Sequence, residues 1–206
     1  MEEYLIQQWN SVVPVDGTVY HLGDIVWTKD PEVVRKIINQ LNGENIYLIP
    51  GNHDYWVKKY VDPKNEVRRI ARLKILPPIH ELHVQDPDAK KSRQIIILCH
   101  YPIETWNHVY KGSWHLHGHC HGNLKHFIPK RREIGVDCVK NLKPISYKDV
   151  KEKMKEIQID DFIISSNGQL HLHVESKDET GIWATDNDGL ENFIDNKELK
   201  DEWSIY

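Results

Sequence analysis

Hydrophobic residues recur at helical spacing in four stretches of the chain. They lie on one side of predicted helices over residues 5–13 and 31–41, and Asn42-Gly43 gives the second helix a C-terminal stop signal. The same spacing predicts helices over residues 65–73 and 146–157. Shorter apolar runs separate these helices and have the length of strands.

The shorter runs predict a set of β-strands. Their residues are either continuously apolar or alternate between apolar and polar, which is typical of buried and half-buried strands respectively. The predicted strands in this part of the chain are 18–22, 46–49, 79–84, 94–99, 114–118 and 132–139. Because helices and strands alternate early and strands predominate later, the sequence predicts an α/β fold.

The last part of the chain differs in character. Short strands are expected at 162–164, 169–174 and 181–184, separated by turn sequences, and the segment is acidic and carries no chemical motif. We therefore expect a main domain over residues 1–157 and a small β-rich C-terminal extension over 158–206.

Composition narrows the class of protein. A chain of 206 residues with 39% hydrophobic residues can bury a core, and a net charge of −4 gives no electrostatic reason for nucleic acid or an anionic membrane to be the main partner. The longest apolar runs are too short to span a bilayer. Three cysteines without a CxxC pair favour a reduced, cytoplasmic protein.

Histidine is concentrated in residues 114–122, WHLHGHCHG. By itself this cluster fits either a metal site or a histidine-rich strand. Polar residues also follow three other predicted strands where each one ends, so that four strand ends carry Gly23-Asp24, Gly51-Asn52-His53-Asp54, His100 and His119-Cys120-His121-Gly122. Singly, these are ordinary turns, an Asx-turn, a packed histidine or a surface tract. Together they offer oxygen and imidazole donors at the strand ends of an α/β sheet, which predicts a metal centre.

The order of these blocks resembles the calcineurin-like metallophosphoesterase family. The resemblance is carried by YHLGD, IPGNHD, LCHYP and LHGHCHG, runs from about Val12 to Met154, and is nearest to the small bacterial and phage members. It implies a four-layer α/β/β/α sandwich that holds two divalent metal ions at its strand ends.

The resemblance also implies a role for each matching residue. Asp24 would bridge the two metals, and Asn52, His100 and His119 would complete the first site. His121 would bind the second metal together with Asp24. The remaining two matched residues are catalytic in this assignment: His53 would stabilise the phosphate or act as general acid, and Asp54 would orient the His53 ring.

The implied reaction is hydrolysis of a phosphodiester or phosphomonoester by a metal-activated water. Mn²⁺ is the expected metal, with iron or Zn²⁺ as alternatives. The expected substrate is a small phosphoester or a nucleotide-type molecule, and nucleic acid would bind only as a substrate. His115 and His117 are expected to pack within their strand, and Cys120 is not expected to be a ligand.

The chain departs from the family pattern at one block. The family's opening Asp-x-His occurs nowhere in the 206 residues, so the first strand would be missing and the second metal site would keep only Asp24 and His121. Three explanations are open: the natural start lies upstream, the protein is a mononuclear hydrolase, or it is a catalytically impaired scaffold that binds a protein partner. We favour the first, because every later ligand of the pattern is present.

Overall fold

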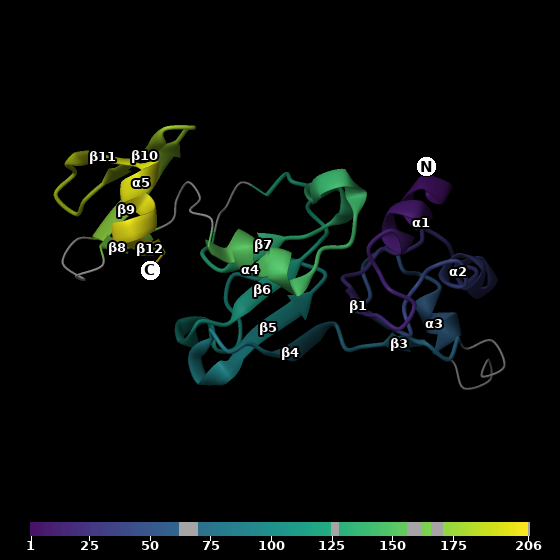
Figure 1. The fold of residues 1–206 in the computed structure, drawn as a ribbon. Helices are drawn as coiled ribbons and strands as arrows, with labels where there is room; N and C mark the ends of the chain where they lie inside the picture. The colour runs from purple at the N-terminus through teal and green to yellow at the C-terminus, as the bar shows by residue number, and fades with distance from the viewer. Residues whose placement is uncertain (62–69, 125–127, 156–161, 166–170, 206) are drawn as a thin grey trace. The chain divides into compact units, whose positions relative to one another are not determined.

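The computed structural model describes residues 1–61, 70–124, 128–155, 162–165 and 171–205 (Figure 1). The contacts between residues divide the chain into two compact units. Unit 1 comprises Met1–Asn123 and Arg131–Ser146, and unit 2 comprises Leu124–Lys130 and Tyr147–Tyr206. Unit 2 therefore begins before the boundary expected between residues 157 and 158, and it takes in a short segment from within the main domain.

A three-stranded parallel sheet in unit 1 leads into the Gly23-Asp24 and Gly51–Asp54 turns. Its strands, in spatial order, are β1 (Thr18–His21), β2 (Asn45–Leu48) and β3 (Leu73–Ile75). Within the described residues, β1 lies at one edge of this sheet. Parallel pairing brings the carboxyl ends of β1 and β2 to the same edge, so both turns start side by side.

Three helices belong to the same part of unit 1: α1 (Glu2–Asn10), α2 (Pro31–Ile38) and α3 (Val57–Tyr60). The start of α2 has a clear local cause. The Asp30 carboxylate accepts the Glu32 N–H at 3.0 Å, and Pro31 occupies the first helical position, where no N–H is needed.

A second, four-stranded sheet leads into the histidine blocks. Its order is β4 (Ile79–Gln85), β5 (Arg93–Cys99), β6 (Trp114–His117) and β7 (Arg131–Glu133). Strands β4 and β5 are antiparallel, whereas β5, β6 and β7 are parallel. Short 3₁₀ turns complete the unit: η2 (Lys90–Ser92), η3 (Val109–Lys111), η4 (Val136–Cys138) and η5 (Lys140–Leu142). The predicted mixed α/β class is confirmed.

Two of the predicted elements differ from the structure. Residues 65–69 of the predicted helix over 65–73 lie outside the described residues, and Leu73 begins strand β3 opposite Ile46. The spacing of Ile70 and Leu73 suits a helix, and the Leu73 N–H donates to the Ile70 carbonyl at 3.0 Å. This is a single turn that leads directly into β3, and both side chains are buried in the core. The strand expected over 132–139 ends at Glu133, because β7 pairs only with the short strand β6.

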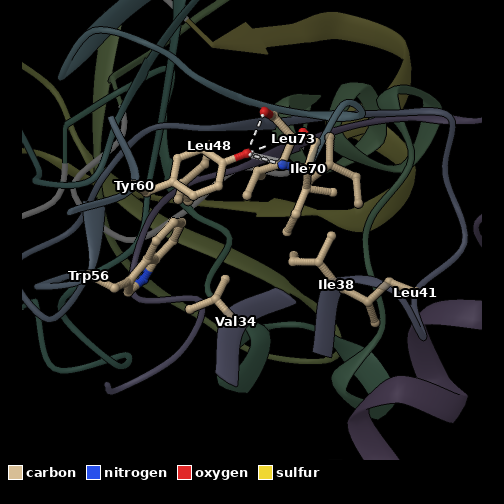
Figure 2. Packing of buried hydrophobic residues seen from close by; sticks show 9 residues of the cluster. Val34, Ile38, Leu41, Leu48, Trp56, Tyr60, Ile70 and Leu73 are labelled. Atoms are coloured by element: carbon tan, nitrogen blue, oxygen red, sulfur yellow. Dashed lines mark hydrogen bonds between the residues drawn. The ribbon is translucent and has the colours of Figure 1, made fainter. Parts of the chain in front are cut away.

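The core of the first sheet is a cluster of nine buried side chains, eight of which are labelled in Figure 2. They are Val34, Ile38, Leu41, Ile46, Leu48, Trp56, Tyr60, Ile70 and Leu73. The Tyr60 hydroxyl is buried with them and accepts the Ile70 N–H at 2.9 Å, so its polar atom is satisfied. This core holds α2 and α3 against the strands that lead into the site.

Unit 2 is largely β-structure, as expected for the C-terminal part of the chain. It contains α4 (Tyr147–Lys155), α5 (Asn196–Glu202) and an antiparallel sheet of order β11-β10-β9-β8-β12. The strands are β8 (Phe162–Ser165), β9 (His171–Lys177), β10 (Gly181–Thr185), β11 (Glu191–Asp195) and β12 (Trp203–Ile205). Leu172, Val174, Ile182, Ala184 and Ile194 form its buried core. The last two strands and α5 were not predicted.

Across the part of the chain that the structure describes, no helix is both long enough and apolar enough to cross a membrane.

His115 packs inside the second sheet, as predicted. It is fully buried in β6; its Nδ1 donates to the Ile97 carbonyl at 3.0 Å, and its Nε2 accepts the Ile103 N–H at 3.2 Å. These two bonds satisfy the neutral ring, and the Tyr101 carbonyl oxygen also lies 3.2 Å from Nε2. Burial lowers the pKa of His115 to about 4.

We expect replacement of Val34 by alanine to lower the free energy of unfolding by about 2–3 kcal/mol, because the removed methyl groups leave a cavity. The adjacent Val33 on the same helix is 39% exposed, whereas Val34 is fully buried. Val33→Ala is therefore a matched control that changes helix propensity equally. Urea denaturation measures both, and equal losses would contradict the assignment of α2's buried face.

We expect stability to fall as the pH drops from 7 to 5, partly because of His115. The unfolded chain binds a proton at this residue near pH 6.5, but the folded protein does so only near pH 4, so acid favours the unfolded state. This residue should account for about 2 kcal/mol of the loss between these pH values. His115→Gln, which cannot titrate, should show a smaller loss in urea denaturation at the two pH values. An equal loss of stability in His115→Gln and the wild-type protein would refute the lowered pKa of His115 as a cause.

Candidate metal centre

His100 is the centre of the site that the sequence predicted. It follows β5 and is 2% exposed, and its Nδ1 donates to the Leu22 carbonyl oxygen at 2.7 Å. Its other nitrogen, Nε2, lies 3.0 Å from Asn52 Oδ1, 3.4 Å from Asp24 Oδ2 and 3.2 Å from His119 Nδ1. Four strand ends thus meet at one imidazole nitrogen, as the sequence predicted for these four residues.

The chemistry of this group suits a cation. A carbonyl oxygen only accepts hydrogen bonds, so Nδ1 of His100 carries the proton, and in the neutral ring Nε2 presents a lone pair. That lone pair faces the oxygens of Asn52 and Asp24, which are also electron-rich. Ligand atoms bound about 2.1 Å from one metal ion, at tetrahedral or right angles, lie about 3.0–3.4 Å apart. The separations of the three partner atoms from His100 Nε2, 3.0, 3.2 and 3.4 Å, fall in that range. The ligand atoms of Asp24 and His119 do not lie within 4.8 Å of each other, so one ion could bind both only if one of these side chains moved.

Three of the predicted ligands have a backbone conformation that side-chain-bearing residues rarely adopt. The φ angles are 57° for Asp24, 75° for His119 and 52° for His121. Left-handed residues other than glycine cost about 1–3 kcal/mol each and tend to occur at functional sites. The backbone of these turns therefore lowers the stability of the fold in order to hold the three side chains in place.

Glycine is required at two positions beside these ligands. A Cβ atom on Gly51 would lie 2.2 Å from Asp24 Oδ1 and 2.7 Å from His100 Cε1. Gly23 has φ +92°, and a Cβ there would lie 2.6 Å from His100 Nδ1. The backbone of the two turns approaches the ligand side chains so closely that no other residue fits.

Asp54 connects the two turns. The sequence analysis expected it to orient the His53 ring, but its carboxylate has other partners. One carboxylate oxygen accepts the N–H groups of Asp24 at 2.6 Å and Gly51 at 2.9 Å. The other accepts the Ile25 N–H at 3.1 Å and the Trp56 indole N–H at 3.2 Å. With four donors on two oxygens, this buried carboxylate acts as a bracket between the Gly23-Asp24 and Gly51–Asp54 turns.

The His53 ring has aromatic partners instead. It stacks on Trp27 with the ring centroids 4.2 Å apart, and its Nδ1 lies 3.3 Å from the Tyr55 hydroxyl. The His53 backbone N–H donates to Asp24 Oδ1 at 2.7 Å, which places the residue beside the predicted bridging carboxylate. Trp27 is 71% exposed, so this ring pair borders solvent.

His121 has a different partner from the other predicted ligands. Its Nδ1 lies 2.5 Å from Asp137 Oδ2, and both side chains are largely exposed. The hydrogen bond and the negative charge of Asp137 raise the pKa of His121. The structure thus brings Asp24, Asn52, His100 and His119 into one contact group and leaves His121 paired with a residue that the sequence analysis did not consider.

A separate set of donors lies nearby. Among the described His, Cys, Asp and Glu side chains, the one group whose ligand atoms all lie within 4.8 Å of each other is His117, Cys120 and Glu133. The sequence analysis assigned His117 to packing and excluded Cys120 as a ligand. Burial and the nearby charge of Glu133 raise the pKa of the Cys120 thiol.

Two aromatic residues at the site, Trp27 and Tyr55, were missed from the sequence, and both flank His53. Tyr101 packs edge-on against His119 with ring centroids 4.7 Å apart. Tyr55 directly follows Asp54, and Tyr101 directly follows His100, so the sequence itself indicates that both lie beside the site. Asp137 and Glu133 carry no comparable signal, because only the pairing of β7 with β6 brings them to the histidine loop.

Comparison with known proteins places the chain in a family. It is 31% identical over 152 residues to Uncharacterized protein MJ1445 of Methanocaldococcus jannaschii, an alignment that covers 71% of this chain and 70% of the archaeal protein. The chain belongs to the family of that archaeal protein. No protein-family model and no solved structure matches the chain. The name of the relative states no activity, so the proposal for function rests on the site itself.

We expect Gly51→Ala to weaken Mn²⁺ binding by roughly tenfold or more, because its Cβ would displace the Asp24 carboxylate. Gly118→Ala is the matched control: a Cβ there would lie 3.6 Å from the Leu22 carbonyl oxygen and 3.9 Å from His100 Nδ1, which are ordinary contacts. Isothermal titration calorimetry with Mn²⁺ measures both. Equal affinities in the two variants would show that the close approach of Gly51 has no bearing on metal binding.

Proposed function

We propose that this protein is a metal-dependent phosphoesterase of the calcineurin-like type, in which an activated water hydrolyses a phosphodiester or phosphomonoester. The observation that carries the proposal is the convergence of Asp24, Asn52 and His119 on His100 Nε2. In this proposal the two sheets of unit 1 correspond to the inner layers of a four-layer α/β/β/α sandwich. Gly23-Asp24, the Gly51–Asp54 turn, His100 and the His119–His121 pair occur in the order that the resemblance requires.

The proposed ligand set divides between two divalent ions. Asp24, Asn52, His100 and His119 would hold the first, and Asp24 with His121 would hold the second. For His121 this requires its ring to turn from Asp137, a change open to a side chain that is 64% exposed. Oxygen and imidazole donors suit Mn²⁺, with iron or Zn²⁺ as alternatives. The bound ions would supply an acidified water as nucleophile and neutralise charge on the phosphoryl oxygens.

The other residues have positioning and proton-transfer roles. The Asp54 bracket would keep the Gly23-Asp24 and Gly51–Asp54 turns at a fixed separation, because it accepts an N–H from each. The His53 ring, stacked on Trp27 at the solvent boundary, would donate a proton to the oxygen of the leaving group. Tyr55, at 3.3 Å from His53 Nδ1, would set which ring nitrogen faces the substrate.

We expect the protein to hydrolyse bis(p-nitrophenyl) phosphate in a reaction that depends on added Mn²⁺. Asp24→Asn should abolish turnover, because it removes the charge that binds the cations. Asp16, an exposed carboxylate in a turn away from these contacts, provides the matched control, and Asp16→Asn should retain activity. A folded protein without Mn²⁺-dependent turnover would refute the proposal that this chain is itself a catalyst. The upstream start and the scaffold that binds a protein partner would then remain as the two explanations.

The role of His53 predicts a dependence on the leaving group. Nitrophenolate leaves readily without a proton, whereas an alkoxide needs one. His53→Gln should therefore slow hydrolysis of an alkyl phosphodiester by about 100-fold and of the nitrophenyl ester by much less. Steady-state kinetics on the two esters tests this. Equal losses would assign His53 to phosphate binding and not to proton transfer.

A further inference from the structure

The His117, Cys120 and Glu133 group is built from adjacent strands and the turn between them. His117 ends β6 and is directly opposite Glu133 in the parallel pairing with β7, so their side chains share one face of the sheet. After His117 the chain turns, with the Cys120 N–H donating to the Gly118 carbonyl at 2.9 Å. This turn brings the Cys120 sulfur to the same face, where the three ligand atoms lie within 4.8 Å of one another.

The His117 ring is held in the tautomer that binds metals. Its Nδ1 donates to the Gly118 carbonyl oxygen at 2.8 Å, and because a carbonyl only accepts, the proton is on Nδ1. Nε2 then keeps a free lone pair. Metal-binding histidines commonly donate their second ring N–H to a backbone carbonyl in this way, which fixes the ring orientation. His117 is 1% exposed, so the ring cannot turn to solvent.

Glu133 provides an independent observation that points to a bound cation, because one of its carboxylate oxygens is buried without a hydrogen-bond donor within the described part of the chain. Its Oε2 accepts the Gly122 N–H at 3.1 Å. Its Oε1 is buried and has no hydrogen-bond partner among the described residues. A buried carboxylate oxygen without a donor is costly, and a metal ion at this position would satisfy it.

We propose that His117, Cys120 and Glu133 bind a Zn²⁺-type cation through Nε2, the thiolate and the carboxylate. A thiolate selects Zn²⁺ over the harder Mn²⁺ and Mg²⁺, and mixed nitrogen, sulfur and oxygen ligands are common for zinc. Three protein ligands leave a fourth position for water. The group shares no residue with the contacts around His100, and the proposal does not depend on phosphoesterase activity.

Such an ion would fix the geometry of the histidine loop. It would link β6, β7 and the turn that carries His119 and His121 on either side of Cys120. Apart from glycine, the loop holds two left-handed residues, so a metal ion bound to Cys120 between them would stabilise a backbone that is otherwise strained.

Cobalt titration tests the site directly. The 206-residue chain, stripped of metal with a chelator and kept reduced, is titrated with Co²⁺ while the near-ultraviolet thiolate-to-cobalt charge-transfer band is recorded. We expect a band whose final absorbance corresponds to about one thiolate-bound Co²⁺ per chain and that Zn²⁺ abolishes. Cys120→Ser should lose the band, and Glu133→Gln should weaken Co²⁺ binding by about tenfold or more.

Two further variants separate this site from its neighbours. Cys138→Ser removes the other cysteine near the loop and should keep the band, and Asp24→Asn alters the group around His100 and should also keep it. Absence of the band in the wild-type protein, or its persistence in Cys120→Ser, would overturn the proposal. If Cys120→Ser fails to fold, as judged by circular dichroism, the affinity of Glu133→Gln decides: unchanged Co²⁺ binding would overturn the proposal in the same way.

Discussion

The hydrogen bond from His100 Nδ1 to the Leu22 carbonyl connects the two sheets of unit 1 at the ends of their strands. It has two consequences for the site. It joins the end of β5 to the end of β1, and it places a proton of His100 on Nδ1, so that Nε2 is the nitrogen that faces Asp24 and Asn52. A second bond, from the Gly118 N–H to the His100 carbonyl, ties the histidine loop to the same residue. The position of every proposed ligand of the first metal therefore depends on how His100 is held.

The surrounding turns combine strain with close packing. Asp24 and His119 have left-handed backbones, and Gly51 leaves no space for a Cβ beside the Asp24 carboxylate. The Asp54 carboxylate offsets this cost with four charge-assisted hydrogen bonds, which are stronger than those between neutral groups. An aspartate outside the proposed ligand set can thus be as necessary to the site as a ligand, because it holds the ligand-bearing turns together.

One short loop contributes residues to two different sets of possible metal ligands. His119 contacts His100, among oxygen and nitrogen atoms that suit hard or borderline cations, whereas Cys120 lies with His117 and Glu133, where a thiolate favours zinc. Adjacent residues in a tight turn point in different directions, so one loop can contribute to both groups. The dense histidine cluster is then not one site but a segment in which each residue has its own partner, including His115 in the core.

The sequence by itself determined the mixed α/β class, most strands of the main domain and the candidate donors at four strand ends. These depend on local hydrophobic period and on the rule that parallel strands of one sheet present their carboxyl ends together. The four ends belong to two separate sheets, so tertiary structure decided that they meet at His100. The sequence could not predict strand β3, because the spacing of Ile70 and Leu73 fits a helix as well. Tertiary structure alone decided that Asp54 brackets two turns and that Glu133 lies opposite His117. Both contacts join residues distant in the chain, and the local hydrophobic period does not specify which distant residues come together.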